Sequence, residues 1–295
     1  MVRVVALVSG FGWHVADLAR AAKELGIDFE PVLFPRLTGR FDRNGPAVSS
    51  GGIDLSKADG VLVRMMPPGT LEQVVFRMDA LHRLEASGVR LMNSPRAVET
   101  AVDKYLTLAR LEQGGLPVPE TWVGESADEA LDAFERLGSD VVVKPLFGSE
   151  GRGLVRVSHR EIAWRTFHAL ERLGSVLYLQ KFIHHPGYDY RVFVLGGRVL
   201  GAIRRTARQD EWRTNVAGGG TAESCRIDAK MESMSLEAAR AVGAEMAGVD
   251  LLPDPSLNGL TILEVNAVPG WRALASATGV DVASELLFEL RAARR

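Results

Sequence analysis

The chain has 295 residues, of which 46% are hydrophobic and 24% charged, and its formal net charge is -2. This length suits two or three packed sub-domains, and the near-neutral charge excludes the broad basic surface typical of nucleic-acid-binding proteins. The one cysteine, Cys225, cannot form an internal disulfide, and the apolar first segment is too short for a signal peptide or a membrane span. We therefore expect a cytoplasmic protein that binds neither nucleic acid nor membranes.

Strand and helix patterns alternate along the N-terminal third of the chain. Residues 2–8 are apolar on both faces, as in a buried parallel strand, and 15–25 has apolar residues at helical spacing followed by Gly26. The other candidates in this part are strands at 29–34 and 60–63 and a helix at 71–86. This alternation predicts a small parallel sheet layered by helices.

The pattern changes near Ala97, where we place a domain boundary, because Ser94 and Pro95 can open a helix and the apolar strands stop. The segment Leu116–Thr121 must be extended, since its prolines cannot donate hydrogen bonds. Beyond the boundary, helices are expected at 104–113, 127–137 and 236–247, and strands at 141–144, 154–157, 176–183, 189–195, 198–204 and 261–265. The whole chain is therefore expected to be of the mixed α/β (α+β) class.

A glycine-rich loop joins two strand-like runs between Val141 and Val157. Its glycines let backbone N–H groups approach phosphate oxygens, and Lys144 at the end of the first run can neutralise phosphate charge. The segment is not a P-loop, because the chain continues as a strand and no Gly-Lys-Ser/Thr follows. A plain hairpin with a mobile tip explains the segment equally well when it is taken alone. The loop residues that would contact a nucleotide are Gly148, Ser149, Gly151 and Gly153.

Glu264 and Asn266 are two residues apart on one expected strand, so their side chains share a face while Val265 points into a core. Asp250, on a neighbouring segment, offers a third oxygen ligand. Mg2+ prefers a few carboxylate or amide oxygens together with substrate phosphates, so this set suits magnesium. A Glu-x-Asn pair also occurs by accident on buried strands, and that alternative stays open.

Arginines gather in the segment Tyr188–Asn215, which contains two strand-like runs joined by the turn signal Gly196 and Gly197. The arginines are Arg191, Arg204, Arg205, Arg208 and Arg213. Guanidinium groups stabilise the charge of a phosphoryl group during transfer. The alternative is an edge strand that carries charge to prevent aggregation.

These segments follow one another in a characteristic order: lysine, glycine-rich hairpin, linking strand, arginine hairpin, and finally the Asp250 and Glu264 segments. In that order, from about Val102 to Gly270, the chain resembles the ATP-grasp superfamily and, within it, the RimK-like ligases that attach glutamate to a carboxylate. The resemblance implies an ATP-grasp fold with an N-terminal small parallel-sheet domain, a lid domain and a C-terminal antiparallel-sheet domain. The corresponding ranges are 1–97 for the substrate side, 98–180 for the lid and 181–295 for the catalytic part.

The resemblance also implies roles for particular residues. Lys104 and Lys144 match the lysines that contact nucleotide phosphates, and Asp189 matches an acidic residue near the ribose. The strand that holds adenine is matched by Gln180, Lys181, Phe182 and Ile183. Lys181 stands where the family usually has Glu, which leaves its backbone to meet the adenine edge. The catalytic, phosphate-facing residues are matched by Arg205, Arg213 and Asn215, the other nucleotide contacts by Arg191 and Thr214, and the magnesium ligands by Asp250, Glu264 and Asn266.

A closer likeness is to the RimK-like enzymes of tetrahydromethanopterin-linked one-carbon metabolism, seen in the runs at 10–14, 144–153 and 264–274. It implies that the protein uses ATP and two Mg2+ ions, with Mn2+ as a possible substitute. Glutamate would be joined, through an acyl phosphate, to a carboxylate of a pterin-type cofactor or a peptide, by a homodimer or homotetramer. Two alternatives stay open: a ligase for another pair of amino acids, as in lysine or D-alanyl-D-alanine synthesis, and a non-catalytic nucleotide-binding module.

Three further residues are candidates for substrate recognition. Trp13 and His14 follow the first strand, where ligands bind in open α/β sheets, and an indole can stack on a flat ring. Packing of Trp13 within a helix and a surface position for His14 are equally compatible with the sequence. Arg272 can hold a substrate carboxylate, although a lone arginine is more often a surface cation.

Overall fold

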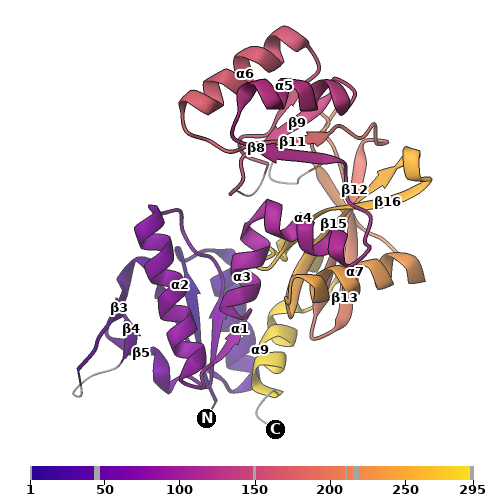
Figure 1. Cartoon of the computed structure of the whole chain (residues 1–295). Coiled ribbons are helices and arrows are strands. Elements are labelled where there is room, and N and C mark those ends of the chain that lie inside the picture. Colours follow the sequence, from indigo (N-terminus) through magenta and orange to yellow (C-terminus); the bar gives the residue numbers. More distant parts are fainter. Residues whose placement is uncertain (1, 43–46, 149–150, 210, 215–218, 293–295) are drawn as a thin grey trace.

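The computed structural model describes residues 2–42, 47–148, 151–209, 211–214 and 219–292. Four sheets organise this part of the chain, and we call them sheets A to D in chain order of their first strands. In Figure 1, sheets A and B lie at the lower left, sheet C at the top and sheet D at the right. Within the described ranges, every helix is too short or too polar to cross a membrane. The mixed α/β class predicted from the sequence is confirmed.

Sheet A has the strand order β2-β1-β6-β7, and every neighbouring pair is parallel. Helices cover both of its faces, so its alternating side chains enter two different cores. Val4 and Ala6 pack with α1 and α9, whereas Val5 and Leu7 pack with α2. The elements are β1 (Arg3–Val8), β2 (Asp28–Leu33), β6 (Gly60–Val63), β7 (Arg90–Met92), α1 (Trp13–Leu25), α2 (Leu71–Ala86) and α9 (Val282–Ala292). The predicted small parallel sheet is therefore present.

Sheet B is a small antiparallel sheet that the sequence patterns do not predict. Its strands, in the order β3-β4-β5, have only two or three residues each, too few to show a period. They are β3 (Leu37–Gly39), β4 (Val48–Ser50) and β5 (Ile53–Asp54), flanked by the short helices η1 (Phe34–Arg36) and η2 (Leu55–Lys57). Val48 and Leu55 are buried in the core on the α2 side of sheet A.

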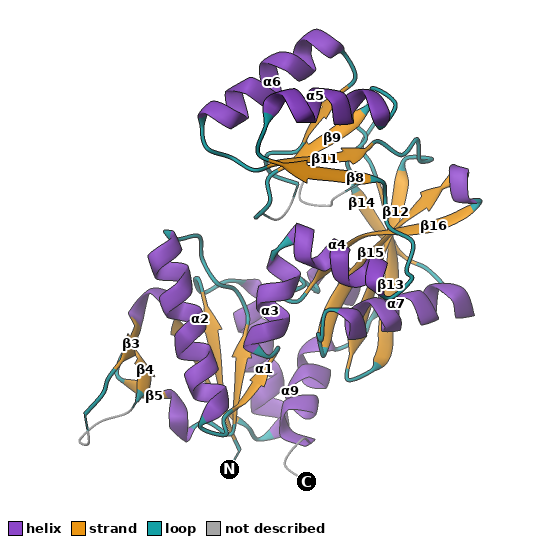
Figure 2. Cartoon of the chain, in the orientation of Figure 1, coloured by secondary structure: helices purple, strands orange, loops and turns teal. Residues whose placement is uncertain are grey.

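Sheet C is antiparallel with the strand order β10-β9-β11-β8, and α5 and α6 cover one face (Figure 2). Phe134 of α5 and Phe167 of α6 pack against Val143 and Leu179 in one apolar cluster. The elements are β8 (Thr121–Gly124), α5 (Ala127–Arg136), β9 (Val141–Lys144), β10 (Val155–Val157), α6 (Arg160–Arg172) and β11 (Leu177–Lys181). The glycine-rich loop therefore joins two paired strands, as predicted, while α6 is an addition to the sequence analysis.

Sheet D is antiparallel with the strand order β14-β13-β12-β15-β16. Gly196 and Gly197 have φ values of 56° and 76° and form the tight turn between β12 and β13, as their sequence predicts. The strands are β12 (Tyr188–Leu195), β13 (Arg198–Thr206), β14 (Thr221–Ser224), β15 (Met246–Asp254) and β16 (Gly259–Asn266). The adjoining helices are α3 (Pro95–Val102), α4 (Lys104–Gln113), α7 (Ala229–Ala241), η4 (Pro255–Leu257) and α8 (Arg272–Thr278).

The helix predicted at 236–247 is wrong at both ends. Helix α7 begins earlier, where the Asp228 side chain accepts a hydrogen bond from the N–H of Met231. It ends before Gly243, whose φ of 71° is unfavourable for other residues and stops the helix. Met246 already belongs to β15, a strand that the sequence analysis took only as a segment adjacent to the metal strand.

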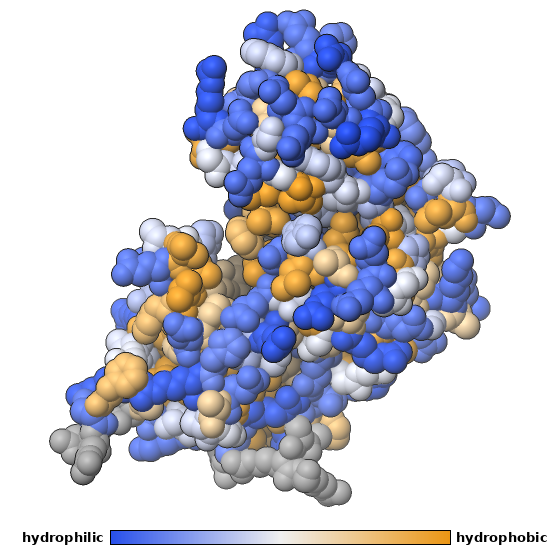
Figure 3. Space-filling model, in the orientation of Figure 1, coloured by the Kyte–Doolittle hydropathy of each residue, from blue (hydrophilic) through white to orange (hydrophobic). Residues whose placement is uncertain are grey.

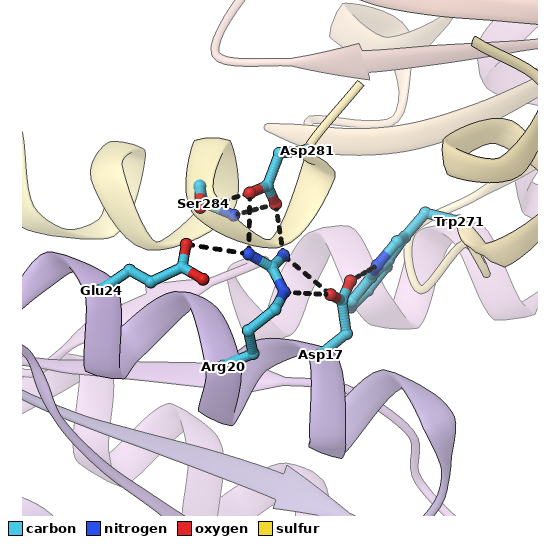
Figure 4. A network of polar contacts seen from close by, with 6 residues as sticks. All are labelled: Asp17, Arg20, Glu24, Trp271, Asp281 and Ser284. Carbon is cyan, nitrogen blue, oxygen red and sulfur yellow. Dashed lines mark hydrogen bonds and ion pairs between the residues drawn. The ribbon is translucent and has the colours of Figure 1, made fainter. Parts of the chain in front are cut away.

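An ion-pair network holds α9 against α1 (Figure 4). The guanidinium of Arg20 donates to both carboxylate oxygens of Asp281, at 2.8 and 3.0 Å, and to Asp17 at 2.8 Å. These contacts lower the pKa of Asp281 to about 2, chiefly through the hydrogen bond from Arg20. Asp17 also accepts the indole N–H of the fully buried Trp271 at 2.9 Å, so the network connects sheet A's helices to the segment after β16.

Asn93 follows β7 and fastens sheet A to sheet D. Its side chain is fully buried and uses all of its hydrogen-bonding capacity. Nδ2 donates to the carbonyls of Met246 at 2.7 Å and Ala267 at 2.6 Å. Oδ1 accepts from the backbone N–H groups of Glu245 and Met246, both at 2.8 Å. One amide therefore satisfies the backbone at the start of β15 and just beyond β16.

Asn93→Ala should lower the free energy of unfolding by roughly 3 kcal/mol, because several buried backbone groups lose their partners at about 1–3 kcal/mol each. Urea unfolding followed by tryptophan fluorescence measures the change. Asn258→Gly is the control: Asn258 is exposed with a φ of 45°, which glycine adopts readily, so stability should change by less than about 0.5 kcal/mol. An Asn93→Ala variant as stable as the parent would show that the hydrogen bonds of Asn93 between sheets A and D do not stabilise the fold.

Candidate active site

Sheet D has one apolar face and one charged face. Val192, Val249 and Val265 are fully buried and pack with the residues of α7. On the other face the register places Asp250 directly opposite both Arg191 and Glu264. The predicted arrangement of Glu264 and Asn266 on one face, with Val265 in a core on the other, is confirmed.

Asp250 is held by two arginines. Nε and Nη2 of Arg191 donate to its two carboxylate oxygens at 2.5 and 2.6 Å, and Nη2 of Arg205 lies 2.9 Å from Oδ2. Arg205 in turn donates to both oxygens of the buried Asp189, and the Thr214 hydroxyl donates to Asp189 at 2.7 Å. The charges alternate across β12, β13 and β15, so each buried ion faces opposite charges.

The charged states of this network follow from its geometry. Burial alone would raise the pKa of Asp250, but Arg191 and Arg205 outweigh burial and lower it. Burial would likewise lower the pKa of Arg205, yet Asp250 and Asp189 raise it. Both groups therefore stay ionised across the physiological range. We call Asp189, Arg191, Arg205 and Asp250 the buried ion network.

Two lysines approach the charged face of sheet D from outside it. Lys104 begins α4, where Asp103 caps the helix by accepting from the N–H groups of Tyr105 and Leu106. Its ammonium donates to the carbonyl of Gly148 in the glycine-rich loop at 2.8 Å. Lys144 ends β9, and its ammonium donates to Oε1 of Gln180. Nε2 of Gln180 donates onward to Thr121 at 3.0 Å, which fixes the orientation of the amide.

Lys104, Lys144 and Glu264 line one cavity of about 50 Å3. The remaining lining residues are Pro145, Gly148, Gly151, Arg152, Leu154, Tyr178 and Leu263. In Figure 3 the surface is hollowed below the body of sheet C, on the side that faces sheet A. Cations from α4 and β9 and a carboxylate from β16 therefore converge, as the sequence reading requires.

Burial depresses the pKa values of both lysines in this cavity. The pKa of Lys144 falls to about 8, because desolvation and the nearby Lys104 outweigh the attraction of Glu264 and Asp250. Desolvation also lowers the pKa of Lys104, against an opposing effect of Glu264. Amines in such surroundings gain most from an anionic ligand, since phosphate oxygens would restore the lost solvation.

Several predicted site residues lie away from this cavity or have other partners. Lys181 forms an ion pair with Glu120 on the surface, so its side chain does not face the cavity lysines. Phe182 lies between the guanidinium of Arg156, 3.5 Å from its ring centre, and the indole of Trp212. Arg213 is exposed and pairs with Glu211 at 2.7 Å. Ser149 and Asn215 lie outside the described residues. The nucleotide contacts predicted for Gly153, Ile183, Asp189, Arg191 and Thr214 stay predictions.

The sequence reading missed Tyr178 and Leu263 as lining residues of the cavity. Tyr178 precedes Gln180 by two positions on β11, so strand alternation alone places both side chains on one face. Leu263 lies beside Glu264 on β16, whose register with β15 shifts between Asp250 and Leu251. Such a shift re-aims side chains, and only the strand pairing reveals it.

Comparison with known proteins decides the family. A family model described as the RimK-like ATP-grasp domain matches residues 101–290. The chain belongs to the RimK-like ATP-grasp family. A tetrahydromethanopterin:alpha-L-glutamate ligase of Methanosarcina acetivorans is 35% identical, across 97% of this chain and 98% of its own. A probable alpha-L-glutamate ligase of a Marinomonas species is 30% identical, across 92% of this chain and 88% of its own.

The solved structures show the same fold. The ATP-grasp ligase PsnB, complexed with a minimal precursor, matches with a TM-score of 0.79 at 20% identity, over 99% of both chains. The predicted ATP-grasp fold is therefore confirmed, and the protein is a carboxylate–amine ligase. Ligases of this family use ATP and magnesium, and PsnB is also known in complex with Mg and ADP.

The residues of this RimK-like chain fit a magnesium ion. Among the described residues no three His, Cys, Asp or Glu side chains gather into a metal cluster, so an ion here would need other oxygens as well. Glu264 and Asn266 supply a carboxylate and an amide on one face. Asp250 accepts three N–H contacts, and a carboxylate has about four acceptor positions, so it can still share an oxygen. Such a mixed oxygen set, completed by substrate phosphates, is what Mg2+ prefers.

Asp189→Ala should lower the free energy of unfolding by about 3 kcal/mol, since it leaves the buried Arg205 with one partner fewer and Thr214 with none of its present acceptors. Chemical denaturation measures the loss. Glu223→Ala is the matched control: Glu223 on β14 pairs with the solvent-exposed side chain of Arg204, the neighbour of Arg205 on β13, and its loss should cost less than about 1 kcal/mol. Equal losses of unfolding free energy in the two variants would show that burial does not make the Asp189 interactions more important for stability than an exposed ion pair.

Proposed function

We propose that this protein uses ATP and Mg2+ to activate a substrate carboxylate as an acyl phosphate and then joins it to the amino group of glutamate. The observation that carries the proposal is the convergence of Lys104, Lys144 and Glu264 on one cavity beneath the glycine-rich loop. The two ammonium groups suit the phosphates, and Glu264 faces them from the strand that also bears Asn266. A second cavity, which His184, His185 and Asp254 help to line, has no lysine or arginine among its lining residues.

The reaction follows from the charges. A carboxylate oxygen of the acceptor attacks the γ-phosphorus of ATP, the bond to the β,γ-bridging oxygen breaks, and ADP leaves. The glutamate amine then attacks the acyl carbon, phosphate departs, and the amine gives up a proton. Lys104 and Lys144 stabilise phosphate charge during the first step, and Arg205 of the buried ion network holds Asp250 in place.

Magnesium would be held by Asp250, Glu264 and Asn266, and when bound it would neutralise phosphate charge. We propose two ions, with Mn2+ as a workable substitute. The ranges 1–97, 98–180 and 181–295 would act as the substrate side, the lid and the catalytic part. Closure of the glycine-rich loop over the cavity would exclude water from the acyl phosphate.

The choice of glutamate rests on relatives whose sequences align with nearly the whole chain. The Methanosarcina acetivorans relative is named as a tetrahydromethanopterin:alpha-L-glutamate ligase and the Marinomonas relative as a probable alpha-L-glutamate ligase. Both names give the amino acid but only one gives an acceptor, which supports glutamate more strongly than a particular acceptor. We propose a pterin-type acceptor such as tetrahydromethanopterin as the first to test.

Glu264→Gln should reduce ADP formation by at least about a hundredfold, because the amide keeps the shape of the side chain but removes the negative charge that faces the metal and lysines. A coupled assay with ATP, Mg2+, L-glutamate and tetrahydromethanopterin measures ADP. Glu232→Gln, at an exposed position of α7, serves as the matched control and should retain full activity. Near-normal turnover of Glu264→Gln, with an unchanged melting temperature, would contradict the assignment of Glu264 as a magnesium ligand.

Affinity for ATP should fall as the pH rises through about 8, because the pKa of Lys144 lies there and deprotonation removes a charge from the phosphate site. A bound phosphate would raise this pKa again, so nucleotide binding at pH 8 to 9 should take up protons. Calorimetric titrations with a non-hydrolysable ATP analogue in two buffers of different ionisation enthalpy measure both effects.

Lys144→Arg keeps its charge throughout this pH range and should flatten the profile. A residual slope would come from Lys104, whose pKa burial also lowers. A parent protein whose affinity is constant between pH 7 and 9 would contradict the placement of Lys144 against the phosphates.

A further inference from the structure

Arg64 is a buried cation at the carboxyl edge of sheet A. It directly follows β6, and its backbone N–H donates to the carbonyl of Leu7 on the neighbouring strand at 2.9 Å. Only 4% of its surface is exposed. Its side chain reaches the segment just after β16, where Nη1 donates to the carbonyl of Val268 at 3.3 Å. The carboxyl ends of parallel strands are where ligands bind in open α/β sheets.

The guanidinium of Arg64 lacks the partner that buried arginines usually have. Its Nε has no hydrogen-bond partner, and no described carboxylate lies within ion-pair distance of it. The remaining contact is with the ring of Trp271, 4.8 Å from its centre. Burial lowers the pKa of Arg64 to about 10. A buried charge with so little compensation is costly, whereas the other buried arginine of the site, Arg205, contacts two carboxylates.

The groups that surround Arg64 are fixed and supply no free negative charge. His14 accepts the backbone N–H of Trp271 with Nε2 at 3.2 Å, and burial followed by Arg64 lowers the pKa of His14 to about 4, so it is neutral. Asp17 is engaged by Arg20 and by the indole of Trp271 (Figure 4). Arg272 is a second cation, exposed above the ring of Trp13.

Arg64 lies next to the strand that bears the proposed metal ligands. The same Val268 that accepts from Arg64 donates its N–H to Oδ1 of Asn266 at 2.8 Å. An anion held by Arg64 would therefore lie at the end of β16, on the sheet A side. The lysines that suit phosphate line the cavity on the sheet C side, which leaves Arg64 for a different anion.

We propose that Arg64 is the binding residue for a carboxylate of a substrate, placed between sheet A and the end of β16. The proposal rests on the proposed ligase function and deepens it by assigning a residue to substrate recognition. A planar guanidinium binds a carboxylate with two parallel hydrogen bonds, which would occupy the unpartnered Nε. Either the glutamate or the acceptor can supply this carboxylate, because both carry one.

The test compares the parent protein with Arg64→Met, Arg64→Lys and the control Arg83→Met. Arg83 makes the same kinds of contact, with the carbonyl of Ala47 and the ring of Phe41, but with no residue of β16 or of the segment after it. Calorimetry with a non-hydrolysable ATP analogue present measures the dissociation constants of L-glutamate and, separately, of tetrahydromethanopterin. Melting temperatures of the free proteins and KM for ATP are measured in parallel.

Arg64→Met should weaken one of the two substrates by at least about thirtyfold, while KM for ATP stays within about twofold. Arg64→Lys, which keeps the charge but loses the fork, should fall between Arg64→Met and the parent protein. The free Arg64→Met protein should melt no lower than the parent, because the variant removes a poorly compensated buried charge. Arg83→Met should leave both substrates unaffected.

The identity of the weakened substrate tells which carboxylate Arg64 binds. Unchanged affinity for both substrates in Arg64→Met overturns the proposal, and so does a lowered melting temperature with unchanged affinities, which would mark Arg64 as structural. Parent protein that binds neither compound also overturns it. ADP formation with other amino acids and acceptors then decides separately whether the ligase function stands.

Discussion

The buried ion network on sheet D is the constraint on which the site depends. Asp189, Arg205, Asp250 and Arg191 alternate in charge across three strands, and each carboxylate takes hydrogen bonds from a planar guanidinium. Buried ions of this kind contribute little net stability compared with apolar residues, but they tolerate only one register of the strands. The separate pairing of β15 with β16 then places Glu264 opposite Asp250, on the side of the cavity lysines. The pairing of the strands therefore determines where the predicted metal ligands lie relative to the lysines.

Much of the fold could be predicted because its signals are local. The helices 71–86 and 104–113 have the predicted bounds, since capping residues and glycines mark their ends. The convergence of Lys144 and Glu264 could be predicted from the order of segments that the family shares. Strand alternation alone gave the common face of Glu264 and Asn266, because a period of two needs no tertiary information.

Other features depend on contacts that a single sequence does not display. The helix expected at 236–247 extended an apolar pattern past the true end of α7 into β15, whose first residues Met246 and Ala247 are fully buried. Arg64 gave no signal either, because a lone arginine after a strand is ordinary until its burial and its missing partner are known. The pairing of Lys181 with Glu120 likewise joins residues far apart in the chain.

Helix α9 lies against α1 and closes one face of sheet A, although the two are separated by nearly the whole chain (Figure 1). Val282, Leu286 and Leu290 occupy the same apolar cluster as Val4 and Leu18. During synthesis the first strands and helices therefore leave the ribosome long before their covering helix exists. Their apolar surface stays available to chaperones or to wrong partners until residues 282–290 are made. The core on this face of sheet A therefore cannot be completed until α9 has been synthesised.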